Sequence, residues 1–490
     1  MIALTSVSVC GASEPQGSRP PNILFFLADD IACPEASCYG GNIHTPNIDA
    51  LAQEGVYFQT CFATPLCQVS RVEMLTGRYA FRTGFYHNWG APNEPLVPKH
   101  VIFTQLLQQA GYKTFVAGKW HHAGVPSTYG FDESCITLGF NGKTWITDDS
   151  EYQGPAGRDG YAASQWWPRV VINDHHYLPT VPDDYGPDIC AERTIDFMTR
   201  HREQPFAAFF FTTLVHTPWL PTPDSDNKPG SDESDMDRDK KDFANFKPSV
   251  EYTDKLLGRL VAAVEKLGLR GRTIIFYSGD NGPAQNLGPD GKPVNGGKGH
   301  AVEEGCRVPM VVSCPGVVPK IGSSSELIDY ADLFPTFVEL AGAKLSENYV
   351  LDGRSFAPLL LGRPFQGREW IYSPLGRKQV LRDKRYLYEG DARFFDCGAL
   401  RDGDGYHEIT ESEIPEDVAA RDRLETILSR LPTPGQQGAS DINMAEYQAQ
   451  EKTVRKRVPS YSIVAYPGMK RPPQWFVEKH PSWFLDTSKK

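Results

Sequence analysis

Several features that mark common classes of protein are missing from this sequence of 490 residues. None of its ten cysteines belongs to a Cys-x-x-Cys pair, which argues against a structural zinc site. No apolar run is long enough to cross a bilayer, so we expect no integral membrane segment. The formal net charge is -11 and the sequence has no run of lysine and arginine, which argues against binding to nucleic acid. An acidic protein can still bind a small anion in a local basic pocket.

The N-terminus carries only part of a secretion signal. Residues 1–12 are apolar and rich in small side chains, but no basic segment precedes them. We interpret them as the remainder of an export signal, which predicts a periplasmic or secreted protein; the alternative is a disordered start. Some cysteines of an exported protein would pair, but the sequence does not give their connectivity.

The remaining composition, 40% hydrophobic and 23% charged, is that of an ordinary globular protein. Four apolar runs are typical of strands that are buried on both faces of a parallel sheet: residues 23–28, 114–117, 206–213 and 273–278. Helical periodicity is clearest at residues 47–54, 103–110 and 249–267. The pattern predicts an α/β fold with a large, mostly parallel sheet flanked by helices.

Each of the four predicted strands ends in polar residues. These are Asp29 and Asp30 after the first strand, Lys119 and His121 after the second, His216 after the third, and Asp280 and Asn281 after the fourth. Because the carboxyl ends of parallel strands meet at one edge of a sheet, where ligands bind, we expect these side chains to converge. Three carboxylates and an amide, without a cluster of Cys and His, favour a hard cation such as Ca²⁺ or Mg²⁺.

A second candidate site lies in the stretch from Cys67 to Arg78. Ser70 and Glu73 have the spacing of a capping box, which predicts a helix that begins at Ser70. Cys67 would then lie just before a helix N-terminus, where unpaired N–H groups favour anions. The alternative is that Cys67 is a buried, inert thiol ahead of a capped helix.

This stretch resembles the signature of the formylglycine-dependent sulfatases, Cys-x-Pro-Ser-Arg followed by Thr-Gly-Arg, with Val69 in place of the usual proline. The resemblance extends over residues 22–361. It includes Gly118-Lys119-Trp120-His121, His216-Thr217-Pro218, Gly296-Gly297-Lys298-Gly299, Asp332-Leu333-Phe334-Pro335-Thr336 and Asp352-Gly353-Arg354-Ser355. It implies an alkaline-phosphatase-like fold with a catalytic domain at residues 22–367. Residues 368–490 would form a smaller C-terminal subdomain, an antiparallel sheet with a helix, and residues 1–21 the signal or disordered start.

The resemblance also implies a mechanism. A formylglycine-generating maturation enzyme would oxidise Cys67 to formylglycine, whose hydrated aldehyde attacks the sulfur of a sulfate ester. Ca²⁺, with Mg²⁺ as the alternative, would be held by Asp29, Asp30, Asp280 and Asn281. Arg71, Lys119 and Lys298 would neutralise the anionic oxygens. His216 would protonate the leaving group. His121 would help to remove the proton from the second hydroxyl of the formylglycine hydrate, and the collapse to the aldehyde would then expel sulfate.

Several alternatives for the function stay open at this point. Long loops and tryptophans between residues 141 and 185, including Trp166 and Trp167, favour a sulfated saccharide over an aryl sulfate as substrate. The alternative is that these tryptophans only hold a long loop to the core. A phosphodiesterase or phosphonate monoester hydrolase of the same superfamily is the alternative enzyme. A non-catalytic binder of sulfated glycans is the alternative if Cys67 is never converted.

Overall fold

The computed structural model describes residues 19–88, 96–137, 164–226, 243–288, 291–398, 406–434 and 436. The predicted export signal at residues 1–12 and most of the predicted loop segment at residues 141–185 lie outside these ranges. Within them, no helix combines the length and the hydropathy that a membrane crossing requires.

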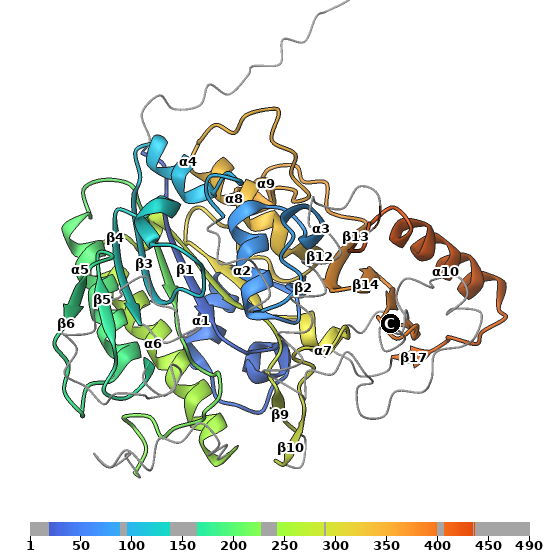
Figure 1. The fold of residues 1–490 in the computed structure, drawn as a ribbon, viewed down its shortest axis with the longest axis horizontal. Coiled ribbons are helices and arrows are strands. Elements are labelled where there is room, and N and C mark those ends of the chain that lie inside the picture. The colour runs from blue at the N-terminus through green and yellow to red at the C-terminus, as the bar shows by residue number, and fades with distance from the viewer. Residues whose placement is uncertain are drawn as a thin grey trace, which may run out of the picture.

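A sheet of ten strands forms the centre of the molecule, in the order β12-β2-β11-β8-β1-β7-β3-β4-β5-β6 (Figure 1). Its middle, from β8 to β4, is entirely parallel, whereas β11, β5 and β6 run antiparallel to their neighbours. The strands are β1 Asn22–Ala28, β2 Val56–Phe62, β3 Lys113–Lys119, β4 Glu133–Thr137, β5 Val170–Ile172, β6 His176–Leu178, β7 Phe206–Phe211, β8 Thr273–Gly279, β11 Met310–Ser313 and β12 Gly322–Asp329.

Both faces of the sheet are covered because alternate side chains of each strand point to opposite sides. Phe25 of β1 packs against Phe209, Phe276 and Phe337, in the same core as α2, α4, α8 and α9. Its neighbour Phe26 belongs to the other core, with α1, α5 and α6 (Figure 1). The helices are α1 Pro46–Glu54, α2 Cys67–Thr76, α3 Ala80–Thr83, α4 Phe103–Gln109, α5 Gly186–Arg200, α6 Phe246–Lys266, α7 Glu303–Cys306, α8 Leu333–Leu340 and α9 Ala357–Leu360.

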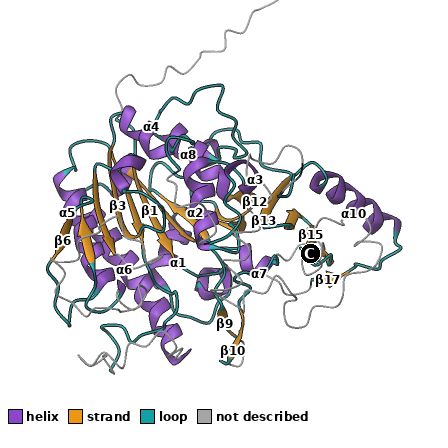
Figure 2. Cartoon of the chain, viewed as in Figure 1, coloured by secondary structure: helices purple, strands orange, loops and turns teal. Residues whose placement is uncertain are grey.

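A second sheet of five antiparallel strands follows in the chain and lies to one side of the first (Figure 2). Leu424 and Leu428 of the helix α10 Pro415–Leu428 share a hydrophobic core with Val380 and Tyr388 of this sheet. Its strands are β13 Trp370–Leu375, β14 Lys378–Asp383, β15 Tyr386–Tyr388, β16 Phe394–Asp396 and β17 His407–Glu408. The predicted fold class, a large mixed sheet with a smaller C-terminal antiparallel sheet, is confirmed, whereas the domain boundary at residue 367 stays a prediction.

The expected run of loops from residue 141 to residue 185 is wrong in part. β5 and β6 lie within it and extend the main sheet. Trp166 lies in the core beside Tyr185, with only 4% of its surface exposed, and its Nε1 donates to the carbonyl of Pro221. This tryptophan therefore holds the segment to the sheet and is not free to stack on a sugar.

Candidate active site

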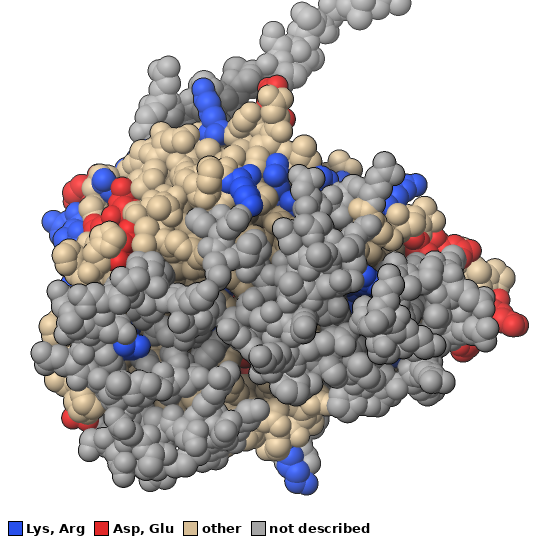
Figure 3. Space-filling view, viewed as in Figure 1, with Lys and Arg blue, Asp and Glu red and all other residues tan. Residues whose placement is uncertain are grey.

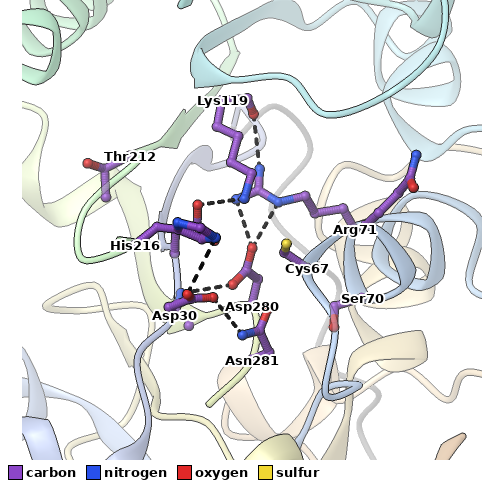
Figure 4. Close-up of polar contacts among 12 residues, drawn as sticks. Asp30, Cys67, Ser70, Arg71, Lys119, Thr212, His216, Asp280 and Asn281 are labelled. Atoms are coloured by element: carbon purple, nitrogen blue, oxygen red, sulfur yellow. Dashed lines mark hydrogen bonds and ion pairs between the residues drawn. The ribbon is translucent and has the colours of Figure 1, made fainter. Parts of the chain in front are cut away.

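The polar residues that follow the four central strands lie together, because β8, β1, β7 and β3 are neighbours in the sheet. The backbone N–H of Asp30 donates to Asp280 Oδ1 at 3.1 Å, and Nε2 of His216 lies 3.6 Å from Asp30 Oδ2. Figure 4 shows these side chains turned toward a common centre, with the sulfur of Cys67 beside Asp280. The predicted convergence of the strand ends is present in the structure.

Three buried carboxylates of this centre each pair with a buried cation. Lys119 Nζ lies 2.5 Å from Asp29 Oδ2, and Lys298 Nζ lies 2.6 Å from Asp30 Oδ1. Arg71 reaches Asp280 Oδ2 through Nε at 3.0 Å and through Nη2 at 2.9 Å. Buried charges are tolerated only when they are paired in this way, so the three cations and three anions are interdependent.

The pairing does not fully offset the cost of burying these carboxylates. Burial and the neighbouring Asp280 raise the pKa of Asp29 to about 7, although Lys119 opposes the shift. Burial also raises the pKa of Asp30, against the effect of Lys298. Binding of a further cation would stabilise the ionised form of these carboxylates, because its charge compensates theirs.

The donor atoms fit a hard divalent cation. Oxygens of Asp29 and Asp280 lie within 4.8 Å of each other and of the sulfur of Cys67. Asp29 Oδ1 and Asn281 Oδ1 are buried and accept no hydrogen bond from the described part of the chain. The amide Nδ2 of Asn281 donates to Asp30 Oδ1 at 2.7 Å, which leaves its oxygen available as a ligand. Carboxylate and amide oxygens are the ligands that Ca²⁺ and Mg²⁺ prefer.

The helix that carries Cys67 begins earlier than the capping-box pattern predicts. α2 starts at Cys67 itself, so the prediction that Ser70 is its N-cap is wrong. The hydroxyl of Ser70 instead lies 2.9 Å from the N–H of Thr64 and fixes the turn before the helix. Glu73 is buried beside Asp329, and burial raises its pKa well above the ordinary value. The N-cap residue is Leu66, which supplies no side-chain cap.

Cys67 therefore occupies the first turn of α2, where N–H groups lack helical partners. The thiol is fully buried, and burial raises its pKa, although Lys119 and Lys298 oppose the shift. Val69, which replaces the signature proline, lies in the same first turn. A proline loses no helical hydrogen bond there, so the helix geometry is open to either residue.

Asn88 lies in the candidate site although no sequence pattern pointed to it. Its Nδ2 donates to the sulfur of Cys67 at 3.4 Å, and its Oδ1 accepts from the backbone N–H of Gln68 at 3.0 Å. One side chain thus contacts both the sulfur of Cys67 and the backbone of the helix start. Asn88 belongs to none of the signature stretches, and only the folded chain brings it to Cys67.

The two histidines are uncharged at neutral pH. Burial, together with Lys298 and Lys119, lowers the pKa of His216 well below its ordinary value, and burial with Lys119 and Arg71 does the same for His121. Nδ1 of His216 lies 2.6 Å from the carbonyl of Thr217, to which it donates. Because Nδ1 carries the proton of the neutral ring, Nε2 is the nitrogen that can accept a proton.

Backbone conformation contributes to the arrangement at three positions. Asp30 and His121 have φ values of 61° and 57°, which are uncommon for residues with a side chain and cluster at functional sites. Gly297 has a φ of 81°, and a Cβ added there would lie 2.4 Å from the N–H of Gly305. Only glycine fits this turn, which carries Lys298 to Asp30.

Known proteins resemble this chain in sequence and in fold. The sulfatase family model matches residues 21–343. Steryl-sulfatase of Rattus norvegicus is 29% identical over 436 residues, which cover 72% of this chain and 72% of that protein. N-acetylgalactosamine-6-sulfatase of Canis lupus familiaris is 27% identical over 403 residues, 76% of this chain and 71% of the relative. The solved structure of Ps i-CgsB has the same fold, with a TM-score of 0.67 at 23% identity over 91% of this chain and all of that one.

Proposed function

Because the chain belongs to the sulfatase family and is a sulfuric ester hydrolase, we propose that it removes sulfate from a carbohydrate through a formylglycine made from Cys67 and a bound divalent cation. The carrying observation is the convergence of Cys67, Arg71, Lys119 and Lys298 on three buried carboxylates. The carbohydrate part of the proposal rests on the N-acetylgalactosamine-6-sulfatases among the relatives. An exported location is part of the proposal and rests on the apolar residues 1–12.

An unmodified Cys67 is a poor nucleophile in this site. Its pKa is raised, so the thiol keeps its proton at neutral pH, and the protonated form does not attack. Formylglycine at this position supplies a geminal diol, which releases sulfate without hydrolysis of a stable sulfated side chain. Asn88, held by the backbone of Gln68, orients whichever group residue 67 carries.

The cation would be held by Asp29, Asp30, Asp280 and Asn281, and it supplies positive charge against the sulfate oxygens. The remaining charge comes from the chain itself. Lys119 and Lys298 are fixed by their ion pairs, and Arg71 is fixed further by a hydrogen bond from Nη1 to the carbonyl of Lys119 at 3.0 Å. These cations are therefore oriented before the substrate arrives, which avoids the cost of ordering them during the reaction.

His216 handles the leaving group in this proposal. Its ring is oriented by the hydrogen bond from Nδ1 to Thr217, which leaves Nε2 as the proton acceptor of the neutral ring. Burial and the charges of Lys298 and Lys119 lower the pKa of His216, and a bound sulfate ester offsets those charges. Nε2 therefore takes a proton from water and passes it to the oxygen of the departing sugar. A sugar hydroxyl is a poor leaving group without that proton. His121 serves the second proton transfer, from residue 67, and its backbone carbonyl is held by Gln68 Nε2 at 3.3 Å.

The test is a substrate panel on protein coexpressed with a formylglycine-generating enzyme. We expect sulfate release from N-acetylgalactosamine 6-sulfate and from an aryl sulfate, and a loss of about a thousandfold or more in the Cys67→Ala variant. Faster turnover of an aryl phosphate diester would instead assign a phosphodiesterase. Turnover of a steryl sulfate alone would overturn the carbohydrate assignment. Binding of sulfated sugar with no sulfate release, despite conversion of Cys67, would leave only the binding function.

A further inference from the structure

A cavity of about 730 Å³ lies between the large sheet and the C-terminal sheet, at the opposite end of α2 from Cys67. Its wall is made by α3 and the residues around it, by the segment before α9, by the start of β13 and by the chain after α10. This volume is in the range of sites that bind sugars and other small ligands. It is lined by Tyr79, Phe81, Arg82, residues 351–354, Arg368, Trp370, residues 429–432 and Gln436.

Positive charge dominates this cavity although the chain as a whole is acidic. Four arginines line it, Arg82, Arg354, Arg368 and Arg430, against a single carboxylate, Asp352. Figure 3 shows several Lys and Arg side chains along the upper edge of the described surface on this face of the molecule. In a protein of net charge -11, this local excess of arginine requires an explanation.

Two of the four arginines are paired with carboxylates of the protein. Arg82 Nε donates to Asp352 Oδ1 at 2.8 Å, and Arg368 Nε donates to both oxygens of the buried Asp332 at 2.8 Å. Arg354 and Arg430 are exposed and form no ion pair within the described ranges of the chain. They therefore have donors to offer to an anion, in the planar arrangement that matches carboxylate and sulfate oxygens.

The cavity also offers aromatic surface beside the charge. Trp370 is half-buried at the start of β13, so part of its ring faces the cavity. Phe81 is 4% exposed and lies under the guanidinium of Arg82, with 5.0 Å between the guanidinium carbon and the ring centroid, so it supports the wall of the cavity. The partly exposed ring of Trp370 beside planar cations suits a sugar residue that carries an anionic group.

We propose that this cavity is a second binding site, which takes an anionic sugar residue of the same saccharide chain whose sulfate ester is cleaved at residue 67. The proposal rests on the proposed carbohydrate function. The ten residues of α2 separate the two places by about 15 Å along the helix axis, so the cavity is not an extension of the reaction centre. The enzyme would hold a long substrate at a point remote from the bond that it cuts.

The experiment compares two double variants in a Cys67→Ala background, where no turnover disturbs binding. Arg354→Ala with Arg430→Ala removes the two unpaired arginines, and Lys266→Ala with Lys320→Ala makes the same change in net charge at exposed positions outside the cavity. The probe is a chondroitin 6-sulfate hexasaccharide, measured by calorimetry against its chemically desulfated form. We expect the arginine variant to bind the sulfated probe about tenfold or more weakly, and the lysine variant to bind it normally.

Activity measurements separate a failure of the cavity proposal from a failure of the proposed function. In the background with Cys67 intact and converted, the arginine variant should raise KM for the sulfated hexasaccharide while kcat for an aryl sulfate stays unchanged. Equal binding by both double variants, or equal weakening in both, would overturn the cavity as a saccharide site even if the enzyme is active. Arginine-dependent binding in a protein without sulfatase activity would support the cavity and overturn the proposed function alone.

Discussion

Binding of the cation should release a proton from Asp29, and the amount should fall as the pH rises. The pKa of Asp29 is raised to about 7 by burial and by Asp280. Without the cation, about nine tenths of the Asp29 side chains carry a proton at pH 6, about half at pH 7 and about one tenth at pH 8. A cation ligand must be ionised, so binding of Ca²⁺ should displace about 0.9, 0.5 and 0.1 proton from Asp29 at these three values, in addition to any proton that Asp30 releases.

The sign of the linked stability change follows from the same shift. Because the folded pKa of Asp29 lies above the unfolded one, its proton stabilises the cation-free protein at low pH. That contribution is lost as the pH rises toward about 7. Ca²⁺ should therefore raise the melting temperature more at pH 8 than at pH 6. The ten-fold range in ionised Asp29 corresponds to about 1.4 kcal/mol of binding free energy.

Calorimetry in two buffers of different ionisation enthalpy measures the displaced protons directly. His121 and His216 do not contribute, because their lowered pKa values keep them neutral throughout this range. Asp29→Asn, which has no proton to lose at this position, should lower the signal and leave only the share of Asp30, whose pKa burial also raises. Asp132→Asn at a partly exposed position should leave the signal unchanged. Proton release that is constant or increases from pH 6 to pH 8, or that is as large in Asp29→Asn as in the unchanged protein, would refute the reasoning.

Three further changes test the site. Cys67→Ser and Cys67→Ala should both lose turnover while calorimetric Ca²⁺ binding is retained, and a serine variant with wild-type turnover would contradict the proposed nucleophile. Asn88→Ala should lower kcat about five- to tenfold, the loss of one hydrogen bond, without changing the mass of the converted peptide; unchanged kcat would show that Asn88 does not orient residue 67. Lys119→Met removes the ion-pair partner of Asp29, whose Oδ2 lies 2.5 Å from Lys119 Nζ. In denaturant unfolding, this change should lower the free energy of unfolding of the cation-free protein by about 3–5 kcal/mol. The control Lys266→Met, at an exposed position, should lower it by less than about 0.5 kcal/mol.

The parts of this structure that could be predicted follow from short-range patterns. The apolar runs of β1, β7 and β8 are buried at every residue, as their lack of alternation indicates. Because these strands are parallel neighbours, their polar ends had to meet, so Asp29, His216 and Asp280 could be placed together from sequence.

What could not be predicted depends on contacts between distant residues. Ser70 has the local pattern of a helix cap, but its hydroxyl accepts a hydrogen bond from the N–H of Thr64, and α2 begins at Cys67. Asn88 has no local signal at all, since its role comes from the path that the chain takes after α3. Trp166 shows the same limit, because its sequence context does not reveal that Tyr185 and Pro221 enclose it.

Every residue of α2 is buried, and Cys67 has no exposed surface. Under the proposed chemistry, a formylglycine-generating enzyme must bind this stretch and oxidise its thiol. In the folded chain that would require α2 to leave two hydrophobic cores at once. The proposal therefore requires that Cys67 is converted before the chain folds. A molecule that folds with its thiol intact would stay unconverted. The fraction of active enzyme would then equal the fraction of chains that were converted before they folded.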